Sequence, residues 1–247
     1  MLADEREVAF VDYGAGRPHP TSPTKGKGRD YRRICDIAKG SLAKKKYAQM
    51  LARLVNWLGR PLLTSPSRGG IGDGRLVIGD RQLAIGNWQL AMGNGLIIVE
   101  LGTSLGVTTA YMAAMDKRNK VITYEGCPAV AEIAKENWKA LGIKNIDCRV
   151  GEITAEILDR DLERVDVAFI DANHTYAGTR AYFNVLAEKV HRKSVMIVDD
   201  IHYNKEMEQA WREICADERV TSTMDLYQMG LVFFDKDYWK RDYRIRV

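Results

Sequence analysis

Three carboxylates and a histidine follow two apolar segments of this sequence. Asp171 ends the run 165–171, and Asp199 and Asp200 end the next apolar run along the chain. If both runs are neighbouring strands, their carboxyl ends meet at one edge of a sheet and the three carboxylates converge. Converging carboxylates repel one another unless a cation lies among them, and all-oxygen ligands suit a hard divalent ion such as Mg²⁺, Ca²⁺ or Mn²⁺. Asp171, Asp199 and Asp200 are therefore candidate metal ligands; loop acids and helix caps explain one of them easily but all three less well.

His174 lies three residues after Asp171. An imidazole has an ordinary pKa near 6.5, so it can accept a proton close to neutral pH. Its place beside the carboxylates makes His174, with Asp171, the candidate catalytic pair, while the alternative is a structural histidine. His202 follows Asp200 by two residues and is better explained as a loop-packing side chain.

A glycine turn follows an earlier apolar run, in the order Glu100-Leu101-Gly102-Thr103-Ser104-Leu105-Gly106. Ser104 and Val107 stand where a nicotinamide-binding turn would have its second and third glycines, so that cofactor is disfavoured. The spacing acid-x-Gly-x-x-x-Gly is instead the one used for S-adenosylmethionine (SAM). Glycines allow a close approach of the backbone, and a helix N-terminus accepts an anionic group. The ammonium of SAM would find the carboxylate of Glu100, and its own carboxylate would find the hydroxyls of Thr103, Ser104 and Thr108.

Two further acids end apolar runs. Glu125 precedes Gly126 and lies 25 residues after Glu100, where an acid can accept both ribose hydroxyls. Glu152 and Ile153 follow the next run, at the usual place for contacts to adenine. For Glu125 and Glu152, the alternative is an acid that begins the next helix.

The elements that must position these residues alternate between strand and helix patterns. Apolar runs separated by amphipathic stretches predict a parallel sheet covered on both faces. A last pair of runs, 220–226 and 231–234, has no room for a helix between its members, so it predicts a final antiparallel hairpin. The other predicted strands are 96–100, 121–125, 147–150, 165–171 and 195–199, and the predicted helices are 107–116, 129–141, 154–162, 179–190 and 205–216.

Composition excludes several classes of protein. The chain has 247 residues, a formal charge of +4 and 46% hydrophobic residues, so disorder throughout is excluded. No apolar run approaches the roughly 18 residues of a membrane span, and the acidic segment 1–7 does not resemble a secretory signal. The four cysteines are scattered, which favours a reducing, cytoplasmic setting over a disulfide frame or a zinc site.

The first 59 residues predict an arm of two amphipathic helices, broken near residues 40–41 and preceded by a basic loop over 14–30. Lys44, Lys45 and Lys46 could contact nucleic acid, but no aromatic platform accompanies them. A solvated helix face therefore explains them better, and we expect no nucleic-acid partner.

Residues 60–95 hold a glycine-rich repeat of seven residues, in which Ile-Gly or Met-Gly recurs at 71, 78, 85 and 92. Glycine in every unit argues against a coiled coil, and Gly-Asp and Gly-Asn pairs are turn signals. We interpret the segment as an insertion that forms either a floppy loop or a small hairpin-like flap, with a substrate lid as a functional alternative.

Residues 96–234 resemble the class I SAM-dependent methyltransferases, on the motif Glu100–Gly106, Glu125, Asp171, the Asp199-Asp200 pair and the terminal hairpin. The segment from Phe169 to Tyr176 resembles metal-dependent O-methyltransferases, in which two Asp and one Asn hold Mg²⁺ and a Lys is the base. Here Asp200 replaces the Asn and His174 falls at the base position. The arm, with Val11–Gly16 and a helix over 47–54, resembles that of a bacterial subgroup.

The resemblance implies an α/β fold: a three-layer Rossmann-like sandwich, with a seven-stranded sheet of order 3-2-1-4-5-7-6 and an antiparallel seventh strand. It also implies a division into the arm 1–59, the insertion 60–95 and a SAM-binding domain 96–247. The cofactor contacts would be Glu100, Gly102, Thr103, Ser104, Gly106, Thr108, Glu125, Gly126, Glu152, Ile153 and Asp171.

The expected activity is methyl transfer from SAM to a hydroxyl of a small molecule, assisted by Mg²⁺ or another hard divalent cation. Such an enzyme needs no membrane, and a homodimer is a possible assembly. Two alternatives stay open. One is a metal-independent N-methyltransferase on the same fold, and the other is a cofactor-binding protein without activity, disabled by the insertion.

Overall fold

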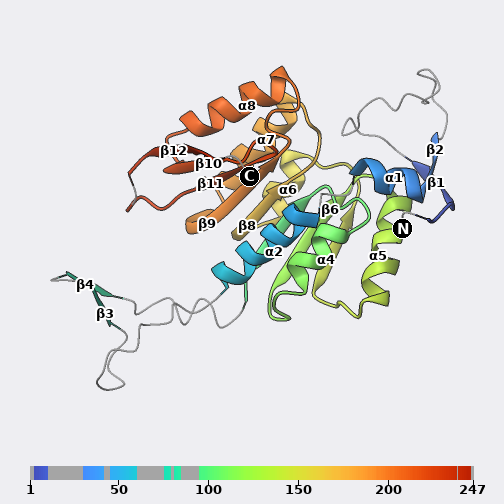
Figure 1. Cartoon of the computed structure of the whole chain (residues 1–247), viewed down its shortest axis with the longest axis horizontal. Helices are drawn as coiled ribbons and strands as arrows, with labels where there is room; N and C mark the ends of the chain where they lie inside the picture. The colour runs from blue at the N-terminus through green and yellow to red at the C-terminus, as the bar shows by residue number, and fades with distance from the viewer. Residues whose placement is uncertain are drawn as a thin grey trace.

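The computed structural model describes residues 3–10, 30–41, 45–59, 75–78, 81–84, 95–237 and 239–245. Its main sheet has eight strands in the order β12-β10-β11-β9-β8-β5-β6-β7 (Figure 1). These strands are β5 (Ile97–Leu101), β6 (Lys120–Glu125), β7 (Ile146–Val150), β8 (Val165–Ile170), β9 (Val190–Asp199), β10 (Ser222–Asp225), β11 (Met229–Phe233) and β12 (Arg241–Arg244). The helices around them are α4 (Val107–Ala113), α5 (Pro128–Ala140), α6 (Ala155–Asp161), α7 (Tyr176–Ala187) and α8 (Lys205–Ala216).

The predicted strand order is confirmed, with one strand more than expected. β7, β6, β5, β8 and β9 run parallel, and β11 lies antiparallel between β9 and β10. The eighth strand, β12, adds to the edge parallel to β10. Its four residues are all exposed, and polar contacts hold it: Thr223 bonds to Asp242 at 2.7 Å, and Arg244 to Asp225 at 3.2 Å. Without apolar alternation, hydrophobic patterning could not reveal this strand.

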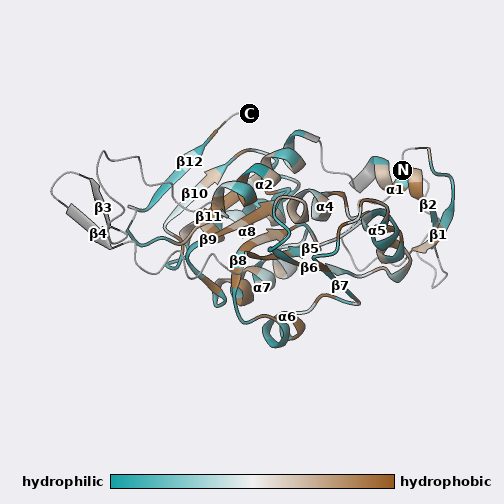
Figure 2. Cartoon of the chain, turned by 90° about the horizontal axis from the view of Figure 1, so that it is seen from below, coloured by the Kyte–Doolittle hydropathy of each residue, from teal (hydrophilic) through white to brown (hydrophobic). Residues whose placement is uncertain are grey.

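Alternate residues of the central strands enter two different cores. In β5, Val99 and Leu101 pack against α6, α7 and α8, whereas Ile98 faces the other side, toward α4. Residues of β8 and β9 alternate in the same way, so the strands are apolar on both faces. Figure 2 colours much of β8 and β9 brown, the hydrophobic end of its scale. None of the helices in the described ranges is long and apolar enough to cross a membrane.

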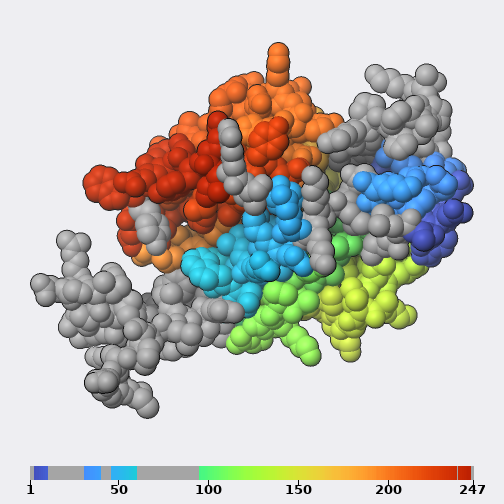
Figure 3. All heavy atoms as spheres, in the orientation of Figure 1, coloured from blue at the N-terminus to red at the C-terminus, as the bar shows by residue number. Residues whose placement is uncertain are grey.

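The N-terminal helices are part of the second layer. Helix α1 (Ile34–Ser41) and helix α2 (Lys45–Leu58) confirm the predicted pair and its break. Tyr47, Leu51 and Val55 of α2 are buried in the core beneath the sheet, and α2 lies beside α4 in Figure 3. The arm therefore completes the sandwich.

Two small sheets lie outside the main one, and the sequence predicted only one of them. β1 (Glu7–Phe10) pairs antiparallel with β2 (Asp30–Arg33), a pairing that local patterns do not reveal because a long stretch of chain separates the two strands. β3 (Arg75–Ile78) pairs antiparallel with β4 (Arg81–Ala84), which agrees with the hairpin alternative for that part of the insertion. The rest of the repeat and most of the basic loop lie outside the described residues. The boundaries 59/60 and 95/96 stay predictions.

Asp166 joins three strands at the edge opposite the predicted site. Its carboxylate accepts the N–H of Ile97 in β5 at 2.7 Å, lies 2.6 Å from Nε2 of His191 in β9, and pairs with Arg164 at 2.7 Å. Burial alone would raise the pKa of Asp166, but these hydrogen bonds outweigh it and lower the pKa.

We expect Asp166→Asn to lower the free energy of unfolding by about 2 kcal/mol at pH 7, because hydrogen bonds to an ionised group are lost. A depressed folded pKa stabilises the fold above the unfolded value of about 3.9, and this contribution disappears as the pH falls. Urea unfolding should therefore show the gap between wild type and variant closing in acid. The control Asp159→Asn, which breaks only the ion pair of an exposed Asp159 with Lys189, should cost less than about 1 kcal/mol. A gap that is the same at every pH would contradict the assignment.

Candidate active site

The predicted site residues lie at one edge of the main sheet, where the parallel strands end. The backbone register pairs Leu101 with both Tyr124 and Ile170, and Ile170 with Val198. The ends of β5, β6, β8 and β9 are thus level with one another. The residues that leave these strands, including Asp171 after β8, are brought to the same edge.

The glycine turn between β5 and α4 requires its first glycine. Gly102 has φ +97°, and a Cβ built there would lie 2.1 Å from the carbonyl oxygen of Asp171. The N–H of Asp171 bonds back to the carbonyl of Leu101 at 2.9 Å, so the turn and the end of β8 are in direct contact. Only a residue without a side chain fits this approach.

The end of the turn is held from both sides. Gly106 has φ +72°, and its carbonyl accepts a 2.7 Å hydrogen bond from the indole N–H of Trp138 in α5. Leu105 is buried among Ile34 and Ile37 of α1, so the N-terminal arm packs against this turn.

Glu125 at the end of β6 contacts the turn directly. Its carboxylate accepts the N–H of Ser104 at 2.8 Å and the N–H of Cys127 at 2.9 Å. Burial raises the pKa of Glu125, and these two hydrogen bonds oppose the rise. Each carboxylate oxygen keeps a further lone pair that can accept from a ligand hydroxyl.

Glu100 lies inside the sheet, at the end of β5 next to the glycine turn. The side chain is fully buried in β5, and it accepts hydrogen bonds from the hydroxyls of Thr109 and Thr123, the latter at 2.7 Å. Burial is the main cause that raises the pKa of Glu100 to about 8. Thr103 is also buried, whereas Thr108 is half-buried in the first turn of α4.

The remaining predicted cofactor residues differ in exposure. Glu152 is exposed after β7. Ile153 is half-buried, and its carbonyl accepts a 3.0 Å hydrogen bond from the hydroxyl of Tyr182. Gly126 is half-buried beside Glu125. These residues share a position at the ends of the strands, and this shared position places them at the site.

The second half of the site is the group formed by Asp171, His174, Asp199 and Asp200. Nε2 of His174 lies 3.3 Å from Oδ1 of Asp171 and 3.7 Å from Oδ2 of Asp200. These distances bring three of the four predicted side chains together, with the imidazole of His174 between the carboxylates of Asp171 and Asp200.

Charge controls the ionisation of this group. Burial favours the neutral form of His174, but the hydrogen bond and charge of Asp171 and the charges of Asp200 and Asp199 outweigh it and raise the pKa of His174 to about 9. Burial raises the pKa of Asp171, and burial together with the two neighbouring carboxylates raises that of Asp199 well above its ordinary value. Near neutral pH His174 is therefore the cation among these acids.

The fit to a metal ion is mixed. The donor set consists of carboxylate oxygens, and Oδ1 of Asp199 is buried without a hydrogen-bond partner in the described part of the chain, which suits a hard cation. In the ranges that the structure describes, however, no group of three or more His, Cys, Asp or Glu side chains is arranged to hold a metal. The imidazole of His174 stands between two of the three proposed ligands.

A hollow of about 280 Å³ adjoins the carboxylates. It is lined by Asp200, His202, Tyr203, Tyr227 and Gln228, and Gln228 donates a hydrogen bond to Asp200. Sequence reasoning missed Gln228 and Tyr227, because they belong to the turn between β10 and β11, which shares no motif with the rest of the site. His202, which the sequence favours as a loop-packing side chain, bonds to Asp225 at 2.9 Å and stacks on Tyr227.

Backbone strain gathers at the same edge. The non-glycine residues with φ in the left-handed region, among those described, are Ser104, Asn173, Asp200 and Tyr227. Each lies in a turn that follows or joins strands of the site. Strain of this kind persists only where surrounding contacts fix the backbone, and it concentrates at functional sites.

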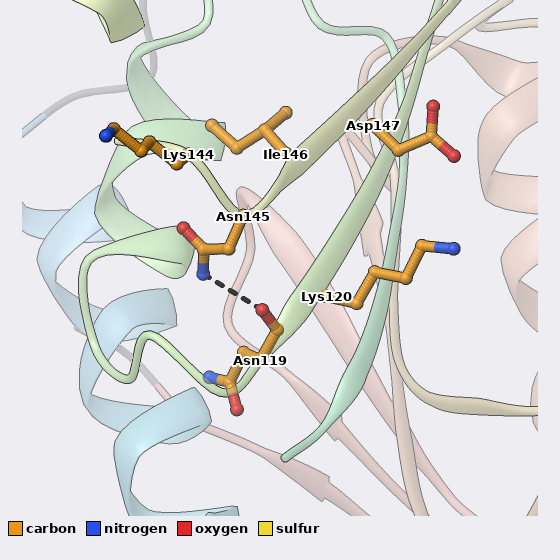
Figure 4. Close-up of a pocket in the computed structure, with 6 residues that line it drawn as sticks. All are labelled: Asn119, Lys120, Lys144, Asn145, Ile146 and Asp147. Carbon is orange, nitrogen blue, oxygen red and sulfur yellow. Dashed lines mark hydrogen bonds between the residues drawn. The ribbon is translucent and has the colours of Figure 1, made fainter. Parts of the chain in front are cut away.

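A second hollow, of about 180 Å³, lies at the opposite edge of the sheet, at the amino ends of β6 and β7 (Figure 4). Asn145 donates to the carbonyl of Asn119 at 2.9 Å there, which ties two loops together. None of the residues that line it was predicted for the site, and its hydrogen bonds are structural.

The order of the strands, the antiparallel β11 and the acidic strand ends define the class I methyltransferase fold. In agreement, residues 99–201 match the profile of a methyltransferase domain. This segment runs from β5 to just beyond Asp200, so it holds the glycine turn and the carboxylate group together.

Curated relatives match over part of their length. An O-methyltransferase from Aspergillus flavus, imqG, is 30% identical over 111 residues, which cover 42% of this chain and 44% of the relative. A protein-L-isoaspartate O-methyltransferase from Magnetococcus marinus is 40% identical over 60 residues, 24% of this chain and 25% of the relative. The chain thus spans less than half the length of these relatives.

Solved structures share the fold over more of the chain. An O-methyltransferase from Bacillus cereus in complex with SAH has a TM-score of 0.56 at 16% identity, covering 81% of this chain and 90% of the other. The O-methyltransferase TomG from Streptomyces achromogenes, in complex with SAM, has a TM-score of 0.58 at 14% identity, covering 81% and 87%. At these identities the likeness establishes the fold.

Proposed function

We propose that this protein transfers a methyl group from SAM to a hydroxyl oxygen of a small molecule. The observation that carries the proposal is that two clusters of polar side chains lie at one edge of the sheet. Glu100 and Glu125 lie at the glycine turn, and Asp171 and His174 lie beside it. The bound complexes of the structurally similar O-methyltransferases support the choice of SAM.

The chain's own residues would bind and orient the two reactants. Glu125 would accept hydrogen bonds from ligand hydroxyls at the end of β6, and Gly102 leaves room for the backbone to approach a ligand. When bound, SAM supplies an electrophilic methyl group. The substrate hydroxyl would enter from the hollow beside Asp200, where Tyr203 and Gln228 can contact it. Much of the rate would come from holding donor and acceptor in line.

His174 would remove the proton of the substrate hydroxyl. The imidazole accepts a proton only in its neutral form and at the ring nitrogen that does not face Asp171, and its pKa of about 9 places that form on the alkaline side of neutrality. Asp171 would orient the ring through the 3.3 Å contact.

We further propose that Asp171, Asp199 and Asp200 hold a hard divalent cation, such as Mg²⁺, which would stabilise the substrate as an alkoxide or phenolate. The partnerless Oδ1 of Asp199 favours this version. The position of His174 between two of the acids favours the second candidate, a metal-independent methyltransferase in which the imidazole alone serves the site.

Binding of SAM to the full chain, measured by titration calorimetry, tests the proposal as a whole. We expect SAM to bind with a dissociation constant in the micromolar range, and SAH to compete with it. Absence of binding by both molecules would exclude methyl transfer by this chain and favour a protein without activity.

Titration with Mg²⁺ separates the two versions. In the metal-assisted version, wild type binds Mg²⁺ and Asp199→Asn weakens this binding by about tenfold or more, because one charged ligand is lost. The control Asp116→Asn removes an acid paired with Arg118 away from the site and should bind Mg²⁺ like wild type. If wild type shows no Mg²⁺ binding while SAM binds, the metal-independent version holds.

A further inference from the structure

Four buried side chains form one chain of hydrogen bonds beneath the glycine turn. The hydroxyl of Thr103 lies 2.6 Å from that of Thr123, which lies 2.7 Å from Oε2 of Glu100, and Thr109 donates to the same oxygen. The members come from the turn, β6, β5 and α4. Three of the four are 0% exposed and Thr103 is 3% exposed, so no solvent competes for these bonds.

When Glu100 is ionised, counting protons fixes the direction of these bonds. An ionised carboxylate only accepts, so Thr123 must give its single proton to Glu100. Thr123 then has only lone pairs left for Thr103, and Thr103 must donate to it. Because its proton is bonded to Thr123, Thr103 cannot then donate to the carboxylate of SAM. The sequence had suggested that it would. If Glu100 binds a proton on Oε2, the bonds can run the other way and the proton of Thr103 is released.

One oxygen of this arrangement has no partner. Oε1 of Glu100 is buried and accepts no hydrogen bond from the described part of the chain. A buried carboxylate oxygen without a donor is costly, and a ligand that brings a cationic N–H would satisfy it.

The surroundings of Glu100 disfavour its ionised form. Burial is the largest cause of its raised pKa, and the charged groups facing it, Asp171 after β8 and Glu125 at the end of β6, are both acidic. The hydroxyls of Thr109 and Thr123 oppose the rise. Loss of either hydroxyl should therefore make Glu100 harder to ionise.

We infer that Thr123 is a positioning residue of the SAM site, which touches no ligand itself but holds Glu100 as an acceptor-only carboxylate toward the ammonium of SAM. The inference rests on the proposed function. It separates two roles within one motif: Glu100 would meet the ligand, and Thr103 and Thr123 would orient Glu100.

The test is the affinity of the full chain for SAM, measured by calorimetry between pH 6.5 and 9.5. Wild-type affinity should rise with pH and level off above about 8, because Glu100 must be ionised to meet a cation. Thr123→Val keeps the β-branched shape and removes the hydroxyl, so it should weaken binding by about tenfold at pH 7.5 and move the rise to higher pH. Thr123→Ser should restore both the affinity and the pH profile.

A buried threonine elsewhere provides the matched control. Thr179 in α7 bonds to the sulfur of Met207, and Thr179→Val should leave the pH profile of SAM binding unchanged. If Thr123→Val leaves SAM binding unaltered, or weakens it equally at every pH without rescue by serine, the inference is wrong. If wild type binds no SAM at any pH, the proposed function fails, which is a different result.

Discussion

Replacement of Gly102 by alanine should remove SAM binding almost completely, with a loss of affinity of about 100-fold or more. The added Cβ would lie 2.1 Å from the carbonyl oxygen of Asp171, and no rotamer change can separate them, because the backbone fixes the position of the Cβ and the oxygen belongs to the backbone. The residue also has φ +97°, which an L side chain rarely adopts. Relief requires the glycine turn to move away from β8, which would displace Ser104 from Glu125.

A second glycine with positive φ isolates the effect of the clash. Gly142 follows α5 with φ +68°, and a Cβ there meets nothing within 4 Å. Gly142→Ala should cost about 1 kcal/mol of stability from the backbone conformation alone and leave SAM affinity as in wild type. Calorimetry and thermal unfolding of both variants measure the two effects. If Gly102→Ala binds SAM within about threefold of wild type, the turn does not form the cofactor site.

Much of the site could be predicted because parallel strands bring their carboxyl ends to one edge. The residues that end the apolar runs of the sequence include Glu125, Asp171 and Asp199, and the structure places each of them at that edge. The strand order followed from the resemblance, and the alternating burial of β5 explains why the runs were continuously apolar.

Contacts between side chains could not be predicted in the same way. The bond from Thr123 to Glu100 links residues 23 apart through the pairing of β5 with β6, and a threonine in an apolar strand was its only trace in the sequence. Gln228 reaches Asp200 from a turn 28 residues away. The pKa of His174 likewise depends on three carboxylates whose distances the sequence does not contain.

The N-terminal arm shows a limit of a different kind. Its helices were predicted from their periodicity, but periodicity says only that one face is apolar and not what that face covers. In the structure, α2 buries Leu51 and Val55 against the sheet, and α1 packs against Leu105 of the glycine turn. The arm is thus part of the support of the proposed SAM site.

Replacement of His174 by glutamine should lower the rate of methyl transfer by about 10²- to 10⁴-fold, the usual effect of removing a general base. Glutamine is close in length and can still hydrogen-bond to Asp171, so the fold and the affinity for SAM should change little. The measurement is the transfer of a tritiated methyl group from SAM to a panel of phenols, sugars and polyols, followed by kcat on any acceptor found with wild type.

The matched control is a histidine at the opposite edge of the sheet. His191→Gln makes the same exchange beside Asp166, 2.6 Å from the imidazole and away from the site, so it should leave kcat within about twofold of wild type. Two results would contradict the base role of His174. If His174→Gln keeps kcat within about tenfold, the imidazole acts only as the counter-ion of Asp171 and Asp200. If its KM for SAM rises while kcat is unchanged, His174 belongs to the binding of the donor. A fall in kcat alone, with SAM bound as tightly as in wild type, would assign the proton transfer to His174, because only the reacting hydroxyl then depends on it.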